Sequence, residues 1–134
     1  MSYEQRVQRR LVAYVRSMHE QIKPKPTLGL FNFRCYENSV EYVRRYPELE
    51  VVEVIYIDNS QPILHYLNYD PEKKEYLETT LGYCAEYLEY YRIRTIDKAD
   101  YRYIGTEFDR GLDVWLKLFT NWFERNILRV TRIL

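Results

Sequence analysis

One cysteine, one histidine and one glutamate of this chain have the types and order that a thiol enzyme needs. Cys35 lies in "FRCYENS", residues 33–39, His65 in "ILHYLN", residues 63–68, and Glu78 in "YLETT", residues 76–80. A cysteine nucleophile needs a base within hydrogen-bonding reach, and that base needs a third group that fixes its tautomer and stabilises its charged form. We therefore expect Cys35 to act as nucleophile, His65 as its base, and Glu78 as the group that orients His65.

A helix over residues 32–46 is predicted to carry the cysteine. Asn32 is a good N-cap residue, and Pro47 would stop the helix. The helical period gathers one apolar stripe with Cys35 at its border, made of Cys35, Tyr36, Ser39, Val40 and Val43. Cys35 then lies in the first helical turn, where free backbone N–H groups and the helix dipole favour a negatively charged thiolate.

Strands are predicted to carry the other two residues. Residues 62–68 and 74–80 are typical of two strands of a hairpin that turns around Asp70 and Pro71. If residue 65 pairs with residue 78, the loop is 70–73 and Glu78 lies beside His65. If residue 65 pairs with residue 79, Glu78 faces the opposite side of the sheet. The sequence leaves both registers open.

The remaining segments complete an α+β layout. Residues 3–22 form an amphipathic helix with Val7, Leu11, Val15, Met18 and Ile22 on its apolar face, and "KPKPTLG" is a connection. Residues 51–57 predict a central strand and 90–96 a fourth strand, while 81–89 are either a helical turn or an extension of the sheet. A final helix begins at a capping box, Thr106 to Asp109, and runs to about Val130. Its apolar face is Leu112, Trp115, Leu118, Phe119, Trp122 and Phe123.

These elements predict one domain spanning residues 1–134. Its small antiparallel sheet of three to four strands packs against the N-terminal helix, the helix starting near Cys35 and the long C-terminal helix. The length suits one core without disulfides or metal. We expect a soluble, cytoplasmic protein with reduced cysteines, since no signal peptide or membrane span is evident.

The composition also limits the expected partners. Lys and Arg number 20, as do Asp and Glu, and this balance argues against a specific nucleic-acid binder or a membrane partner. Neither a glycine-rich phosphate loop nor histidines at ligand spacing point to a cofactor or a metal, so none is expected. The 15 tyrosines suit either half-buried core positions or a contact surface for another protein.

The motifs "CYENS", "LHY" and "LETT" together resemble the core of transglutaminase-like proteins within the papain-like cysteine group, over about residues 31–80. The resemblance implies Cys35 as nucleophile, His65 as general base and then acid, Glu78 as orienting acid, and the backbone N–H of Cys35 as an oxyanion donor. The family commonly has an aromatic residue where this chain has Leu67, and an aspartate where it has Glu78. A papain-type glutamine before the cysteine is absent from the sequence, and Asn32 and Asn38 are the nearest amides.

Two functions follow from these observations. The first is a cysteine hydrolase or acyl-transferase, of amidase, deamidase, peptidase or transglutaminase type, that acts on a protein or peptide. Water or an amine would resolve the acyl-enzyme, and the sequence does not distinguish them. The second is a non-catalytic binding or inhibitory protein on the same scaffold, with a tyrosine-rich contact surface. In that second case Cys35 and His65 are residues of the core and Glu78 is an ordinary strand residue.

Overall fold

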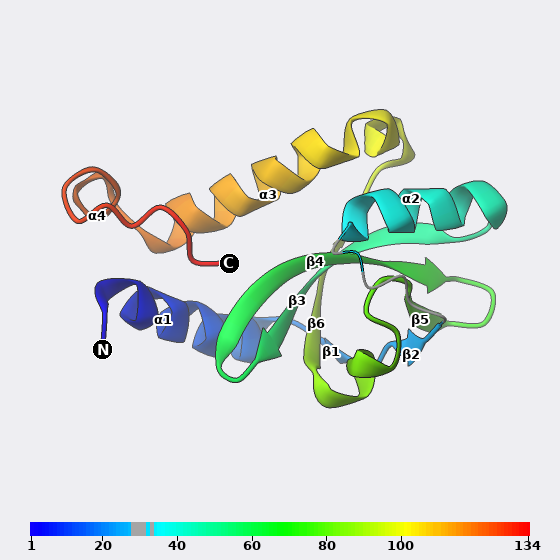
Figure 1. The fold of residues 1–134 in the computed structure, drawn as a ribbon, viewed down its shortest axis with the longest axis horizontal. Helices are drawn as coiled ribbons and strands as arrows, with labels where there is room; N and C mark the ends of the chain where they lie inside the picture. The colour runs from blue at the N-terminus through cyan, green and yellow to red at the C-terminus, as the bar shows by residue number, and fades with distance from the viewer. Residues whose placement is uncertain (28–31, 33) are drawn as a thin grey trace.

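The computed structural model describes residues 1–27, 32 and 34–134, which form helices around a curled sheet (Figure 1). The α+β class predicted from the sequence is confirmed. In chain order the elements are α1 (Tyr3–Met18), β1 (Gln21–Ile22), β2 (Lys25–Pro26), α2 (Cys35–Arg45), β3 (Glu50–Asp58), β4 (Gln61–Asp70), β5 (Glu75–Glu78), the 3₁₀ helix η1 (Gly82–Tyr87), β6 (Glu89–Thr95), the 3₁₀ helix η2 (Lys98–Tyr103), α3 (Ile104–Phe119) and α4 (Trp122–Asn126). Within these residues no helix is long and apolar enough to cross a membrane.

The sheet has six strands in the order β1-β6-β3-β4-β5-β2, so the prediction of three to four strands was too low. β3 lies inside the sheet, as its continuous run of apolar residues predicted. β2 pairs with β5 in parallel, whereas every other pair is antiparallel. The two additional strands, β1 and β2, occupy the segment predicted as helix end and connection. Each has only two residues, and no periodic pattern can mark so short a strand.

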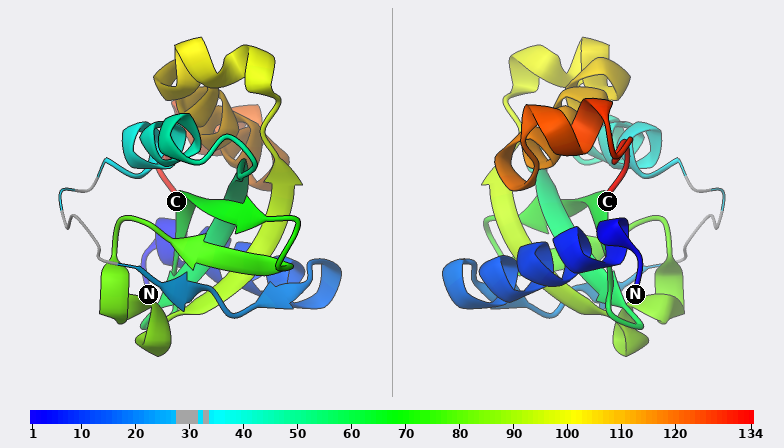
Figure 2. Two further views of the ribbon diagram at one scale, coloured as in Figure 1. Left: turned by 90° about the vertical axis from the view of Figure 1, so that its right-hand side faces the viewer. Right: turned by 90° about the vertical axis from the view of Figure 1, so that its left-hand side faces the viewer.

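The positions of β1 and β2 explain why the sheet curls. They form its opposite edges, yet only residues 23–24 separate them in the chain. Since a few residues span at most about 3.3–3.6 Å each, the two edges must approach one another. The sheet therefore wraps around its own inner face, as the end-on views show (Figure 2).

The alternation of side chains along the strands divides the core between the two faces of this curled sheet. The inner face buries one cluster, which is Ile22, Val52, Val54, Leu67, Ala85 and Tyr90. The outer face is covered by helices: α1 and α3 pack over Ile55, Ile57 and Leu64, and α2 packs over Val51 and Tyr66. Neighbouring residues of one strand thus belong to hydrophobic clusters on opposite faces of the sheet.

The predicted helices are confirmed over their buried turns, but several of their predicted first and last residues are wrong. α1 begins at the capping box of Ser2 and Gln5 but stops at Met18, four residues before the predicted end. α2 ends before Pro47 as predicted, but it starts at Cys35 with Arg34 as N-cap. Asn32 lies further out, and its Oδ1 accepts the Arg34 N–H at 3.1 Å.

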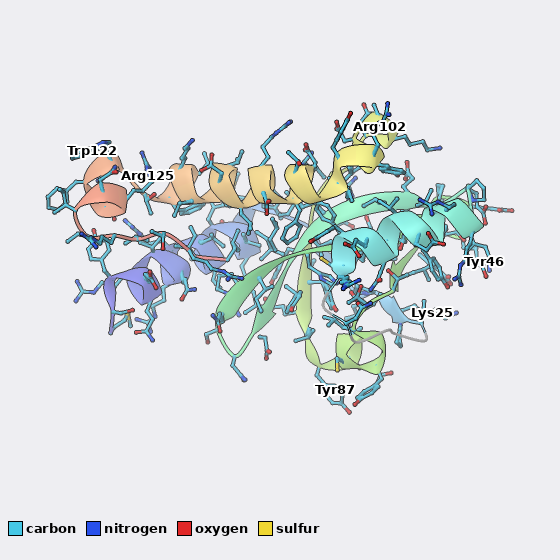
Figure 3. All side chains as sticks on the ribbon, turned by 45° about the horizontal axis from the view of Figure 1, so that its top comes forward. Lys25, Tyr46, Tyr87, Arg102, Trp122 and Arg125 are labelled. Carbon is cyan, nitrogen blue, oxygen red and sulfur yellow. The ribbon has the colours of Figure 1, made fainter. Side chains whose placement is uncertain are left out.

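The predicted C-terminal helix is divided into two, and it starts earlier than the sequence suggested. α3 begins at Ile104, directly after η2, so the expected capping box at Thr106 lies inside the helix. Thr120 is extended and Asn121 caps α4 in a new direction. Trp122 and Phe123, which were predicted to be buried, are consequently exposed, and Leu118 near the end of α3 is exposed as well. Trp122 projects from the α4 end of the molecule, far from Lys25 and Tyr87 (Figure 3).

Gly111 in α3 provides a direct test of how closely this helix approaches the sheet. A Cβ at this position would lie 2.6 Å from Glu53 Oε1 and 3.1 Å from Leu64 Cδ2. Glu53 cannot easily withdraw, because it is 2% exposed and its Oε2 accepts from Arg94 Nε at 3.0 Å. We predict that Gly111→Ala lowers the free energy of unfolding by about 1–3 kcal/mol, the usual cost of overpacking, measured by urea denaturation.

Gly105 in the same helix is the matched control. A Cβ there would meet only the Tyr36 ring, at 3.5 Å, which is an ordinary contact. Gly105→Ala is expected to leave stability unchanged or to raise it by up to about 1 kcal/mol, because alanine is the better helix former. Equal effects of the two substitutions would contradict the close approach of α3 to Glu53.

Candidate functional site

The hairpin of β4 and β5 has neither of the two registers considered from the sequence. Asn68 pairs with Leu77, Tyr69 with Tyr76 and Asp70 with Glu75. Continued along the strands, this register places Thr80 opposite His65, so both alternatives were wrong. The shift from the 65–78 pairing is two residues, and because side chains alternate with period two, Glu78 still lies on the same face as His65.

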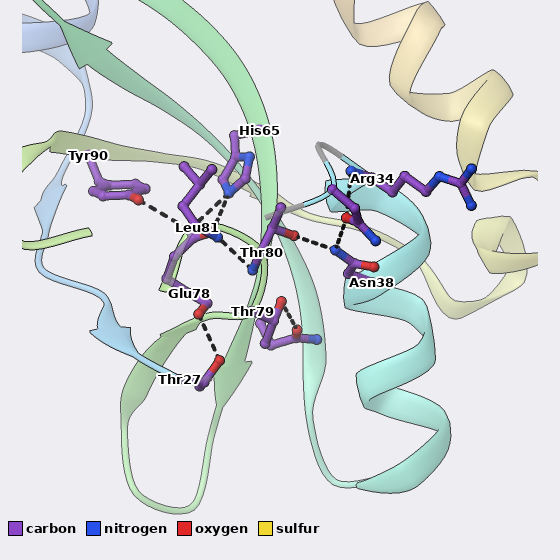
Figure 4. Close-up of polar contacts among 11 residues, drawn as sticks. Thr27, Arg34, Asn38, His65, Glu78, Thr79, Thr80, Leu81 and Tyr90 are labelled. Carbon is purple, nitrogen blue, oxygen red and sulfur yellow. Dashed lines mark hydrogen bonds and ion pairs between the residues drawn. The ribbon is translucent and has the colours of Figure 1, made fainter. Parts of the chain in front are cut away.

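His65 and Glu78 form a buried pair on the inner side of the curled sheet (Figure 4). His65 Nε2 lies 2.8 Å from Glu78 Oε1 and 2.9 Å from Oε2. The side chains are 5% and 0% exposed. Sequence reasoning thus correctly joined these two residues, which are 13 positions apart in the chain.

The turn that follows β5 fixes the Glu78 carboxylate. Oε1 accepts the backbone N–H groups of Thr80 at 3.2 Å and Leu81 at 2.9 Å, and Oε2 accepts the Tyr90 hydroxyl at 3.2 Å. Burial alone would raise the pKa of Glu78, but the charge of His65 and these hydrogen bonds outweigh it and lower the pKa. The length of the glutamate side chain lets the carboxylate reach back to its own following backbone.

Cys35 enters the site from α2, whose first residue it is, and only 6% of it is exposed. Cys35 lies near enough to His65 to contribute to the raised pKa of its imidazole. Because Nε2 of His65 is already bound to Glu78, Nδ1 is the nitrogen available to the thiol. The structure thus brings together all three residues expected from the sequence, each from a different element.

The surroundings of His65 favour its protonated form. Burial alone would lower its pKa, but the negative charge of Glu78, the hydrogen bond to Glu78 and the interaction with Cys35 outweigh burial. Together they raise the pKa of His65 to about 10. At neutral pH the His65 ring is therefore an imidazolium paired with the Glu78 carboxylate.

Two tyrosines that the sequence did not single out enclose this pair. The Tyr56 ring meets His65 edge-on, with centroids 5.2 Å apart, and the Tyr90 ring lies 6.4 Å away. Burial is the main cause that raises the pKa of Tyr56 to about 12, and it also raises the pKa of Tyr90. Both phenols therefore stay neutral. The only available signal was their place on alternating strand positions that share the face of His65.

The amides near Cys35 have a structural use. Asn38 Nδ2 donates to Asn32 Oδ1 at 2.9 Å and to Thr80 Oγ1 at 3.0 Å. An amide nitrogen carries two hydrogens, so Asn38 has no donor left for an oxyanion. The backbone N–H groups in the first turn of α2, including that of Cys35, have no partner within the helix and are the donors that remain.

The other cysteine, Cys84, lies half-buried in η1 and is free. No group of three or more His, Cys, Asp or Glu side chains that could hold a metal occurs among the residues whose positions are described. Comparison with protein-family models, with curated proteins and with solved structures finds no match for this chain. A function for this chain must therefore be inferred from the geometry of Cys35, His65 and Glu78.

The raised pKa of His65 predicts how stability depends on pH. Between about pH 6.5 and 10 the folded state holds a proton that the unfolded state has lost, so stability is complete below this range and declines as pH rises through it. From about pH 6 to about pH 8, the free energy of unfolding should fall by on the order of 2 kcal/mol from this group. Urea denaturation at both pH values measures the decline.

The double variant His65→Gln/Glu78→Gln is the control, because it replaces the charged pair by neutral side chains of similar size. Its free energy of unfolding should be nearly independent of pH over the same interval. The depressed pKa of Glu78 does not interfere, since its contribution is lost only when pH falls below the ordinary range of a carboxyl group. An equal decline in both proteins would contradict the protonated state of His65.

Proposed function

We propose that this protein is a cysteine hydrolase or acyl-transferase of transglutaminase-like type, acting on an amide or thioester of a protein or peptide. The observation that carries the proposal is the convergence of Cys35 and Glu78 on the two sides of one imidazole. Glu78 holds Nε2 at 2.8 and 2.9 Å, and Cys35 lies near enough to the same ring to help raise its pKa.

The first half of the reaction forms an acyl-enzyme. In the proposed resting state His65 holds the proton and Cys35 is a thiolate, and the Cys35 sulfur attacks the carbonyl carbon of the substrate. Negative charge that develops on the carbonyl oxygen meets the N–H groups at the start of α2. The bond between the acyl carbon and the leaving nitrogen or sulfur then breaks, and His65 gives its proton to that leaving group.

The second half releases the acyl group. Water or an amine attacks the thioester, His65 takes the proton of this nucleophile and keeps it, and the sulfur of Cys35 leaves as a thiolate. Water gives hydrolysis or deamidation, and an amine gives a new amide bond. Glu78 holds the ring orientation and stabilises its positive charge through both halves.

A buried histidine–glutamate pair could also serve only the stability of the fold, and the position of Cys35 argues against that reading. A merely structural pair needs no thiol against the remaining nitrogen. In this chain the cysteine is placed at a helix N-terminus, where the dipole stabilises negative charge. The site therefore contains a nucleophile, a base, an orienting acid and oxyanion donors in one place.

The first test measures alkylation of Cys35 by iodoacetamide, in a Cys84→Ser background that leaves one thiol. We predict that the rates at about pH 9 and pH 6 differ by less than tenfold, because His65 keeps the thiol reactive at low pH. In His65→Ala the ratio should approach the roughly hundredfold or larger value of an unpaired thiol with an ordinary pKa near 8.5. Taking the ratio cancels differences in access to the buried sulfur.

Equal ratios in the parent protein and His65→Ala would overturn the proposal and favour the non-catalytic binding protein. Glu78→Gln is expected to give an intermediate ratio, since it keeps the hydrogen bond to His65 but removes the charge that raises its pKa.

The second test asks for acyl transfer itself, with 4-nitrophenyl acetate as a general acyl donor. Mass spectrometry should find one acetyl group on Cys35, and its loss in buffer should be faster when glycine amide is added if amines are accepted. Cys35→Ser should remain unmodified, and His65→Ala should slow both steps by about 10²–10⁴-fold, the usual contribution of general acid–base catalysis. Acetylation of Cys84 at the same rate as Cys35 would show that the site has no special reactivity.

A further inference from the structure

Two buried asparagines fasten α2 to the sheet, and each uses one of two consecutive threonines. Asn68 on β4 donates to the backbone oxygen of Ser39 at 2.9 Å and accepts from Thr79 Oγ1 at 3.0 Å. Asn38 on α2 donates to Thr80 Oγ1 at 3.0 Å. The two asparagines are 0% and 8% exposed. Asn38 of the motif "CYENS" is thus bonded directly to Thr80 of "LETT", and Ser39 is connected to Thr79 through Asn68.

The Asn38 contact differs from the Asn68 contact in what it connects. Asn38 lies three residues after Cys35, so the two side chains are on neighbouring parts of one helix face. Its partner Thr80 gives its backbone N–H to Glu78 Oε1. A single hydrogen bond therefore links the helix turn that carries the nucleophile to the residue that holds the orienting acid (Figure 4).

We propose that Asn38, through Thr80, is the positioning residue that sets Cys35 against His65; this inference rests on the proposed function. Asn38 touches neither the imidazole nor the reacting sulfur in the contacts described. It acts by fixing the start of α2 relative to Glu78 and hence to the ring that Glu78 orients. Small displacements at this point change the distance from sulfur to imidazole, on which proton transfer depends steeply.

The test compares variants by the ratio of Cys35 alkylation rates with iodoacetamide at about pH 9 and pH 6, in the Cys84→Ser background. Thr80→Val removes the hydroxyl acceptor but keeps the shape, whereas Thr80→Ser keeps the hydroxyl. We expect Asn38→Ala and Thr80→Val each to raise the ratio about tenfold, equivalent to one unit of pH, and Thr80→Ser to restore the parent value. The double variant Asn38→Ala/Thr80→Val should give no further rise, because both changes break the same bond.

Asn68→Ala is the matched control for general loosening of α2. It removes the buried hydrogen bond to the Ser39 oxygen of the same helix, so it should lower thermal stability as Asn38→Ala does, yet leave the rate ratio unchanged. A rise in Asn68→Ala equal to that in Asn38→Ala, or no rise in Asn38→Ala and Thr80→Val, would overturn the positioning role. If Asn38→Ala does not fold, the pair Thr80→Val and Thr80→Ser decides the question alone.

The outcomes separate this inference from the proposed function. A ratio that responds to His65→Ala but not to Thr80→Val keeps the catalytic pair and rejects the role of Asn38. A ratio that does not respond to His65→Ala rejects the catalytic pair itself.

Discussion

The arrangement of the strands and turn around the site depends on the burial of one charged pair, His65 and Glu78. Moving two ions out of water costs several kcal/mol each unless both are paired and hydrogen-bonded. Here the carboxylate accepts from His65, two backbone N–H groups and the Tyr90 hydroxyl. The turn after β5 and the place of β6 are therefore tied to the ionisation of two side chains. Removing either partner alone would leave a buried charge, which is why the neutral double replacement is the control for stability.

The fold supplies the enclosure that this pair requires. The two-residue strands β1 and β2 close the sheet around its inner face, and α2 lies against β4 with its N-terminus at His65. Burial strengthens the electrostatic effect of Glu78 on the imidazole, since the effective dielectric inside is lower than in water. The same closeness that keeps His65 protonated brings a thiol to its other side. Stability and the proposed chemistry thus depend on the same contacts.

The sequence predicted the parts of the site that follow from local periodicity. The helix start near Cys35, the strand of His65 and the strand of Glu78 each carry their own pattern, and their order was enough to join the three residues. The register of β5 against β4 could not be predicted from the sequence, because a two-residue shift of β5 leaves the same side chains on the same face of the sheet. β1 and β2 exist only through their pairing with β6 and β5, whereas the break at Thr120 has a local signal, the capping box of Asn121 and Glu124, that the sequence prediction missed. Asn38, Thr80 and Tyr90 were missed because their roles arise from partners distant in the chain.

The protonation state of His65 is the most direct test of this account, and NMR titration of its ring nitrogens measures it. We expect the imidazole of His65, identified by its absence in His65→Gln, to keep both protons past neutral pH and to lose one only near the raised pKa of about 10. Glu78→Gln should move that titration to lower pH. A His65 that titrates near its ordinary value of about 6.5 in the unaltered protein would contradict the charged pair and everything inferred from it.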